Sequence, residues 1–236
     1  MRSRYSGLIV VAFSLGLVTA VAAEEEIYAT SISISDTKPG APVSVVFKFA
    51  AKDDVFEKVD RVAIDMPVGT TVNRNGLSVL CYLKNTDSDG GEICAKMYSG
   101  AKVGSGSMTT SSLGRHTVVA DAYLVDTKNT PGGANLAFFF PSGQVFGVGA
   151  QTIFGSLKLS SGAALQVVME NIQDQLSLPF GMAARIISNE FEFSGQSGES
   201  VYRNPEKGDV ESWSFAARLS WSGGGQSTTM HATSAP

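Results

Sequence analysis

The sequence predicts an all-β protein, an antiparallel β-sandwich of about ten strands in a single domain. Apolar residues recur at every second position along most of the chain, and clusters of Gly, Pro, Asn and Asp separate these stretches. Amphipathic helical patterns do not intervene between them, which disfavours an α/β fold. One β domain of about 200 residues is of ordinary size, so no second domain is needed.

The individual strands are predicted from the alternation of side chains between two faces. In the first strand Tyr28, Thr30 and Ile32 share one face, and small residues occupy the other. A helical turn or two is predicted only at residues 171–177. The same alternation marks residues 28–35, 43–49, 59–66, 103–110, 116–125, 134–141, 151–160, 164–170, 185–193 and 213–221.

Residues 1–23 are predicted to be a secretory signal peptide. Arg2 and Arg4 give a positively charged start, and residues 8–18 form an apolar stretch that is too short to span a bilayer. Small residues up to Ala23 then supply a cleavage site. No later apolar run is long enough for a membrane helix, so no transmembrane segment is expected after cleavage.

The remainder divides into two parts by composition. Residues 24–222 carry the strand pattern and are expected to form the β-sandwich domain. Residues 223–236 are rich in Gly, Ser and Thr and lack periodicity, so they are expected to form a flexible tail. The whole chain has a formal net charge of −4, from 18 Lys and Arg against 22 Asp and Glu. Nucleic acid is therefore not an expected partner.

Cys81 and Cys94 are the two cysteines of the chain. An even pair in an exported protein indicates a disulfide, which would stabilise the fold by about 3 kcal/mol through loop closure in the unfolded state. A redox or metal site is disfavoured, because the pair lacks the C-x-x-C spacing and a neighbouring histidine.

The loop between the cysteines contains a half-match to a calcium-binding loop. Asn85, Asp87 and Asp89 place oxygen donors at positions 1, 3 and 5, and Gly90 follows at position 6. Lys96 stands where the closing glutamate should be. A calcium site and a plain acidic turn are both compatible with these residues, and calcium is the single cofactor that the sequence suggests.

No catalytic set is predicted. A nucleophilic triad needs a histidine, and the two histidines are His116 at an expected turn and His231 in the expected tail. Glu190 and Glu192 could serve as paired carboxylates, but they alternate with apolar residues and are expected on the solvent side of a strand.

Aromatic residues are expected mainly in the core. Trp213 and Trp221 share a face with Phe215 and Leu219, so both tryptophans are predicted to be buried. The run at residues 138–140 places Phe139 opposite the other two phenylalanines. One of the three is therefore expected to be either exposed, as part of a partner-binding patch, or buried against a second layer.

A longer set of motifs carries a resemblance to a known group. The set comprises Met66 to Asn73, then Cys81 and Cys94, then a Val-Gly-Ser-Gly segment at 103–106, a glycine-rich turn before the strand at 132–140, and Leu178 to Gly181. This order resembles uncharacterised secreted β-rich proteins, mostly actinobacterial, in which two cysteines precede a VGxG segment. In that group a proline usually follows the second cysteine, where this chain has Ala95. The resemblance implies bacterial export, a disulfide and a β fold, and it implies no activity.

These observations predict a secreted, non-catalytic protein that binds or adheres at the cell envelope, with an envelope component or another protein as partner. Two alternatives remain open: an extracytoplasmic hydrolase that acts on polysaccharide, and a calcium-binding module centred on Asp87 and Asp89. Two acids that converge in a deep cleft would favour the hydrolase. Carboxylates scattered over the surface would favour the binding protein.

Overall fold

A computed structural model describes residues 27–52, 58–72, 80–83, 90–111, 114–144, 148–159, 164–176, 185–194, 202–206, 212–222 and 224–234. The predicted signal peptide lies outside the described residues, as do the candidate calcium ligands Asn85, Asp87 and Asp89. All statements below concern the described part of the chain.

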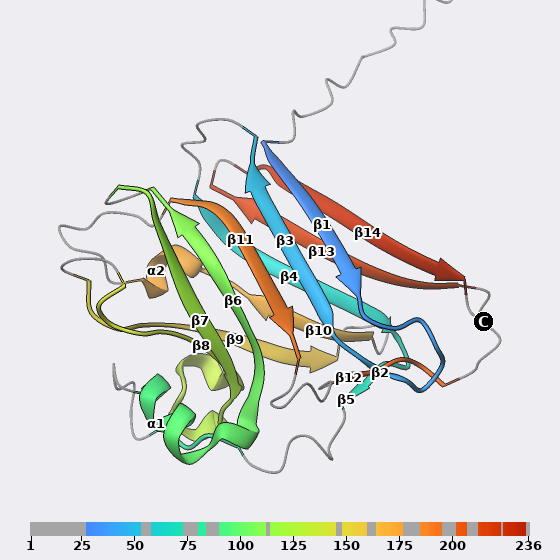
Figure 1. Cartoon of the computed structure of the whole chain (residues 1–236), viewed down its shortest axis with the longest axis horizontal. Coiled ribbons are helices and arrows are strands. Elements are labelled where there is room, and N and C mark those ends of the chain that lie inside the picture. The colour runs from blue at the N-terminus through green and yellow to red at the C-terminus, as the bar shows by residue number, and fades with distance from the viewer. Residues whose placement is uncertain are drawn as a thin grey trace, which may run out of the picture.

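The all-β prediction is confirmed, with eleven strands in one antiparallel sheet and three short strands in a second, small sheet (Figure 1). The sandwich is not confirmed, because the main strands belong to one sheet. The small sheet contains β2 (Pro42–Val43), β5 (Thr71–Val72) and β12 (Tyr202–Arg203). The main sheet contains β1 (Tyr28–Ile34), β3 (Val45–Ala51), β4 (Val59–Val68), β6 (Lys102–Thr110), β7 (His116–Leu124), β8 (Leu136–Phe140), β9 (Gln151–Leu159), β10 (Ala164–Met169), β11 (Ile186–Phe193), β13 (Ser212–Trp221) and β14 (Gln226–Ser234).

The main sheet curls until its two outer strands meet. The strand order is β1-β3-β11-β6-β7-β8-β9-β10-β4-β13-β14, and β1 and β14 lie side by side (Figure 1). Their side chains are joined by a hydrogen bond of 3.2 Å between Thr30 Oγ1 and Ser227 Oγ. The nearly closed sheet therefore shields the inward side chains of its own strands from water.

The inward face of the sheet forms the main core. Trp213 and Trp221 are 3% and 8% exposed, which confirms that they are core residues. On β6, Gly104 and Gly106 let the ring of Phe191 lie directly on the backbone, since a Cβ atom at either glycine would come within 2.6 Å of that ring. This packing explains why a G-x-G pattern occurs inside a strand. The largest fully buried side chains are Tyr28, Tyr202, Phe47, Phe193, Phe215, Ile64, Met66, Leu136 and Leu219.

The prediction of a flexible tail from residue 223 is wrong. Residues Gln226–Ser234 form β14, which pairs with β13 from Ser212 to Ser220. The segment has no clear apolar alternation, but an edge strand is held by backbone hydrogen bonds that do not depend on side-chain type. Polar side chains are also usual on an edge strand.

Helical structure is confined to short segments outside the sheet. The predicted helical turn is confirmed as α2 (Ile172–Gln175), and an unexpected helix, α1 (Gly90–Met97), lies over β8, below α2 on the left of Figure 1. Three single 3-10 turns complete the described connections: η2 (Ser99–Ala101), η3 (Thr127–Asn129) and η4 (Pro131–Gly133). None of the described helices is long and apolar enough to cross a membrane.

Candidate binding cleft

The predicted disulfide is confirmed. It joins α1 to residues 80–83, and these two segments form a second layer, here called the outer layer, on the outside of the sheet. Cys81 and Cys94 are bonded, with their Cα atoms 5.5 Å apart. The Cys81 N–H donates to the Leu124 carbonyl oxygen at 2.9 Å, and the Asp126 N–H donates to the Cys81 carbonyl oxygen at 3.0 Å. Residues 80–83, here called the cysteine segment, are thereby fixed at the end of β7. The disulfide links α1 to this segment.

Beneath this layer lies a small hydrophobic cluster, here called the outer cluster. Phe139 belongs to it, whereas Phe138 belongs to the main core, so the predicted division of the phenylalanine run between two faces is confirmed. Helix α1 lies so close that a Cβ atom at Gly91 would be 2.5 Å from the Cβ of Phe139. The buried members of the outer cluster are Cys81, Leu83, Cys94, Ala101, Tyr123, Val125, Ala137 and Phe139.

A cleft of about 430 Å³ opens between α1 and the outer faces of β7, β8 and β9. It is here called the α1 cleft. Its volume falls within the range of about 300–1,000 Å³ that is typical of ligand sites. Aromatic, carboxylate, amide and small side chains all border it. The lining residues are Gly91, Glu92, Ala95, Asp121, Tyr123, Phe139, Phe140, Pro141, Ser142, Ala150 and Gln151.

Both carboxylates of the α1 cleft are paired with lysines. Lys102 Nζ lies 2.7 Å from Asp121 Oδ1, and Lys96 pairs with Glu92 one turn along the helix. The Lys96 ammonium lowers the pKa of Glu92 through a hydrogen bond and its positive charge. Burial raises the pKa of Tyr123 to about 12, and the negative charge and hydrogen bond of Asp121 add to that increase.

The structure therefore brings two acids into one cleft, which is an arrangement that the hydrolase alternative requires. A glycosidase, however, needs a general acid whose pKa is raised. The pKa of Glu92 is shifted in the opposite direction. The α1 cleft presents hydrogen-bond acceptors beside aromatic side chains, and this chemistry suits binding better than proton transfer.

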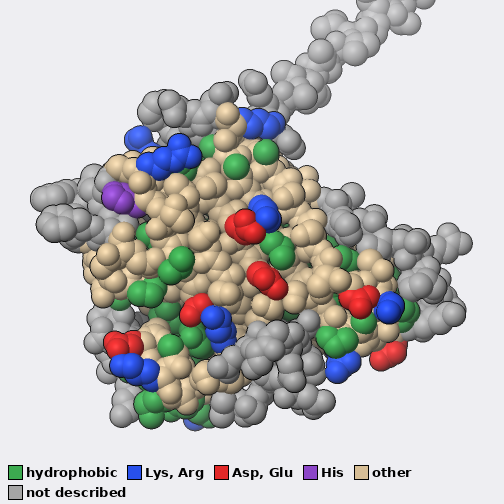
Figure 2. All heavy atoms as spheres, in the orientation of Figure 1, with side chains coloured by type: hydrophobic (Ala, Val, Ile, Leu, Met, Phe, Trp, Pro, Cys, Tyr) green, Lys and Arg blue, Asp and Glu red, His purple; other side chains and the backbone are tan. Residues whose placement is uncertain are grey.

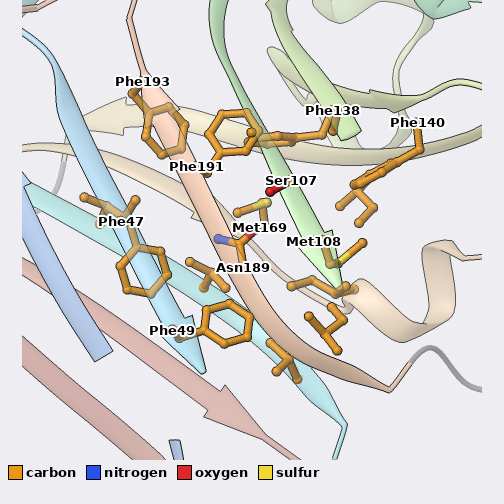
Figure 3. Close-up of a pocket in the computed structure, with 18 residues that line it drawn as sticks. Phe47, Phe49, Ser107, Met108, Phe138, Phe140, Met169, Asn189, Phe191 and Phe193 are labelled. Carbon is orange, nitrogen blue, oxygen red and sulfur yellow. The ribbon is translucent and has the colours of Figure 1, made fainter. Parts of the chain in front are cut away.

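The interior of the sheet contains a second, much smaller space. Phenylalanine and methionine side chains surround an apolar cavity of about 50 Å³, into which Asn189 projects an amide (Figure 3). Phe138 and Phe191 meet edge to face across it, with ring centroids 5.2 Å apart. A space of this size accommodates water molecules rather than a drug-sized ligand. The interior is therefore packed core.

The other candidate residues of the sequence are dispersed. His116 begins β7, and His231 lies in β14. Glu190 and Glu192 are exposed on β11, and Lys48 Nζ pairs with Glu190 at 2.7 Å, so their predicted place on the solvent side is confirmed. On the face seen in Figure 2, several acidic side chains lie next to a basic one, and these small mixed groups are scattered over the surface. Among the described residues, no three His, Cys, Asp or Glu side chains gather as a metal site.

Apart from Phe139 and Phe140, the residues of the α1 cleft were not selected from the sequence. Asp121 and Tyr123 stand two positions apart on β7, and this spacing places both on the outer face of a strand whose alternate residues enter the core. The spacing of Asp121 and Tyr123 was therefore the sequence feature that could have indicated this wall of the cleft. Glu92 and Ala95 could not be placed, because α1 itself was not expected.

Comparisons with known proteins leave the chain without an assigned family. No family model matches it, and no curated protein matches its sequence. Among solved structures, it is similar to one described as "AvmM Catalyzes Macrocyclization in Alchivemycin A Biosynthesis", with 6% sequence identity and a TM-score of 0.31 over 90% of this chain and 91% of that chain. A TM-score this low carries no argument about the activity of this chain.

Proposed function

We propose that the protein is a secreted, non-catalytic binding protein of the cell envelope, and that the α1 cleft is its binding site. The signal peptide expected at residues 1–23 supports export. The disulfide between Cys81 and Cys94 fits an oxidising extracytoplasmic compartment. The partner is an envelope component that enters the α1 cleft.

The observation that carries the proposal is that the α1 cleft is already formed in the protein without a ligand. Its walls are fixed in advance by a disulfide, by the contact of Gly91 with Phe139, and by backbone hydrogen bonds of Cys81. A site that is already formed loses less conformational entropy when a ligand binds. Glu92 and Asp121 border the α1 cleft with carboxylate oxygens, which are strong hydrogen-bond acceptors.

The runner-up is a polysaccharide hydrolase at the same place. The observation in its favour is that Glu92 and Asp121 line one cleft. The lowered pKa of Glu92 opposes it, because a carboxyl that is ionised at neutral pH cannot donate the proton that a leaving sugar requires.

A pull-down with isolated envelope fractions tests the proposal. Ala95→Trp should fill the α1 cleft, because Ala95 faces it from the helix, and retention on the fraction should be lost. Met97→Trp is the matched control, since Met97 is on the same helix, is 70% exposed and does not line the cleft. Circular dichroism and thermal melting establish that both variants are folded.

Two results would contradict the proposal. Equal retention of wild type and Ala95→Trp would place binding outside the α1 cleft. Release of reducing sugar from envelope polysaccharide by the wild type, abolished by Asp121→Asn, would establish the hydrolase instead.

A further inference from the structure

A second hollow lies on the same outer surface of the sheet. It measures about 600 Å³ and is here called the β9 groove, because residues of β9 form its base. Phe154, Ser156 and Lys158 project from that strand. The turn η4 borders one side, and α2 borders the other.

The α1 cleft and the β9 groove adjoin through strand register. Asp121 on β7 is opposite Phe139 on β8, and Phe139 is opposite Thr152 on β9. Residues directly opposite each other in antiparallel strands point to the same face. Asp121 and Phe139 line the α1 cleft, and Thr152 lines the β9 groove. Because neighbouring strands lie about 4.8 Å apart, one row of side chains joins the two hollows over about 10 Å.

The far wall of the β9 groove is also fixed in place. Gln175 of α2 accepts a hydrogen bond from the Phe154 N–H at 2.6 Å through its Oε1 atom. Its Nε2 atom donates to the carbonyl oxygens of Phe154 at 3.1 Å and Glu170 at 2.8 Å. These three hydrogen bonds attach α2 to β9 and β10, so the groove is formed before any ligand arrives.

The chemistry of the combined surface suits a neutral ligand. Glu92 and Asp121 line one hollow, Glu170 and Asp174 line the other, and Lys158 is the basic lining residue. Lys96, Lys102 and Arg61 pair with Glu92, Asp121 and Glu170, so the surface carries little net charge and does not favour a strongly charged polymer of either sign. A peptide cannot add as a strand here, because β7, β8, β9 and β10 each have two strand neighbours and offer no free edge.

We propose, resting on the proposed function, that the α1 cleft and the β9 groove form one extended site for a neutral oligosaccharide chain. Carboxylates and hydroxyls from Asp121, Thr152 and Ser156 accept and donate hydrogen bonds to sugar hydroxyls, and the ring of Phe154 supports an apolar sugar face. One end of the chain lies under α1, and the other reaches toward α2. A polymer fits better than a single sugar because two preformed hollows adjoin in one row.

Chain-length dependence of binding tests the inference. Calorimetry is performed with neutral glucose and N-acetylglucosamine oligomers of increasing length, from the disaccharide upward. Affinity should rise with length and then level off once both hollows are filled. Ser156→Trp, which fills the β9 groove, should lower the affinity for the longest binding oligomer by about tenfold and leave the shortest unaffected. Leu159→Trp is the matched control, because Leu159 is exposed on the same strand and lies outside the groove.

The outcomes separate this inference from the proposed function. Affinity that is independent of length, or equal loss in Ser156→Trp and Leu159→Trp, would overturn the extended site while binding to envelope fractions stands. If no neutral oligomer binds, but Ala95→Trp still abolishes retention on the envelope fraction, the assignment of a neutral oligosaccharide is wrong and the proposed function stands. If Ala95→Trp is retained on the envelope fraction as well as the wild type, the proposed function is wrong too.

Discussion

Phe138 and Phe139 are neighbours in the sequence and belong to two different hydrophobic cores. Phe138 lies in the main core, which the curled sheet encloses with its own strands. Phe139 lies in the outer cluster, which is covered by α1 and the cysteine segment. The main core needs no cross-link, whereas the outer cluster is closed by the disulfide between Cys81 and Cys94.

The difference shows how the molecule separates stability from binding. The nearly closed sheet packs its interior tightly, and the cavity lined by Phe138 and Asn189 measures about 50 Å³. The outer cluster is smaller, and two of its members, Tyr123 and Phe139, line the α1 cleft of about 430 Å³. The α1 cleft therefore opens where a thin second layer meets the sheet, and the disulfide keeps that layer in position.

The largest expected effect is removal of a ring from the main core. Phe138→Ala should lower the free energy of unfolding by about 3–5 kcal/mol, because it removes a buried ring and enlarges the cavity in the packed core. Phe139→Ala should cost less, since the outer cluster borders an open cleft from which water can enter. Urea unfolding followed by tryptophan fluorescence measures both variants. Equal losses, or a greater loss for Phe139→Ala, would contradict the ranking of the two cores.

Removal of the disulfide should have the next largest effect. Cys81→Ala combined with Cys94→Ala should destabilise the outer layer by about 3 kcal/mol, because the loop between them gains freedom when it opens. Retention on envelope fractions should fall at the same time, since α1 forms one wall of the cleft. Loss of stability with unchanged retention would show that binding does not depend on the outer layer.

A smaller effect is expected from Tyr123 at alkaline pH. The pKa of its hydroxyl is about 12 in the folded protein and 10 ordinarily, so the folded state holds this proton more tightly than the unfolded state. Its contribution to stability is complete below pH 10 and is lost as the pH rises through 12. Tyr123→Phe should reduce that alkaline decline in urea unfolding. A decline as steep as in the wild type would contradict the assignment, and Tyr82→Phe, at an exposed ring of the same layer, serves as control.

The smallest effect is expected at the surface of α1. Glu92→Gln removes an ion pair with Lys96 that is exposed to solvent and is screened by salt. The melting temperature should remain within measurement error, and so should its dependence on salt. A clear fall in the melting temperature would mean that this ion pair, rather than the disulfide, positions the helix.

Much of the fold was predictable because a half-buried strand has an apolar side chain at every second residue. All ten predicted stretches contain a strand, although residues 43–49 are divided between β2 and β3. The strand β14 was missed because backbone pairing with β13 does not require apolar side chains at alternate positions, and the prediction relied on that alternation. The sandwich was predicted in place of a nearly closed sheet because alternation identifies faces and does not identify strand neighbours.

The site was less predictable than the fold. The disulfide followed from the number of cysteines and the export signal. Helix α1 did not, because it begins with Gly90 and Gly91, which are poor helix formers, and is held by the disulfide and by contact with Phe139. Asp121 and Tyr123 share a cleft with Glu92 only because α1 packs on Phe139. Local propensity therefore could not assemble the α1 cleft.

Hydrogen exchange with and without reductant tests most directly whether the disulfide-held outer layer sits on an independently stable sheet. Reduction should accelerate amide exchange in α1 and around Cys81, while β3, β4, β11 and β13 keep the protection they have in the oxidised protein. Uniform acceleration across all strands, or unchanged protection of α1, would contradict the separation of the binding layer from the stable core.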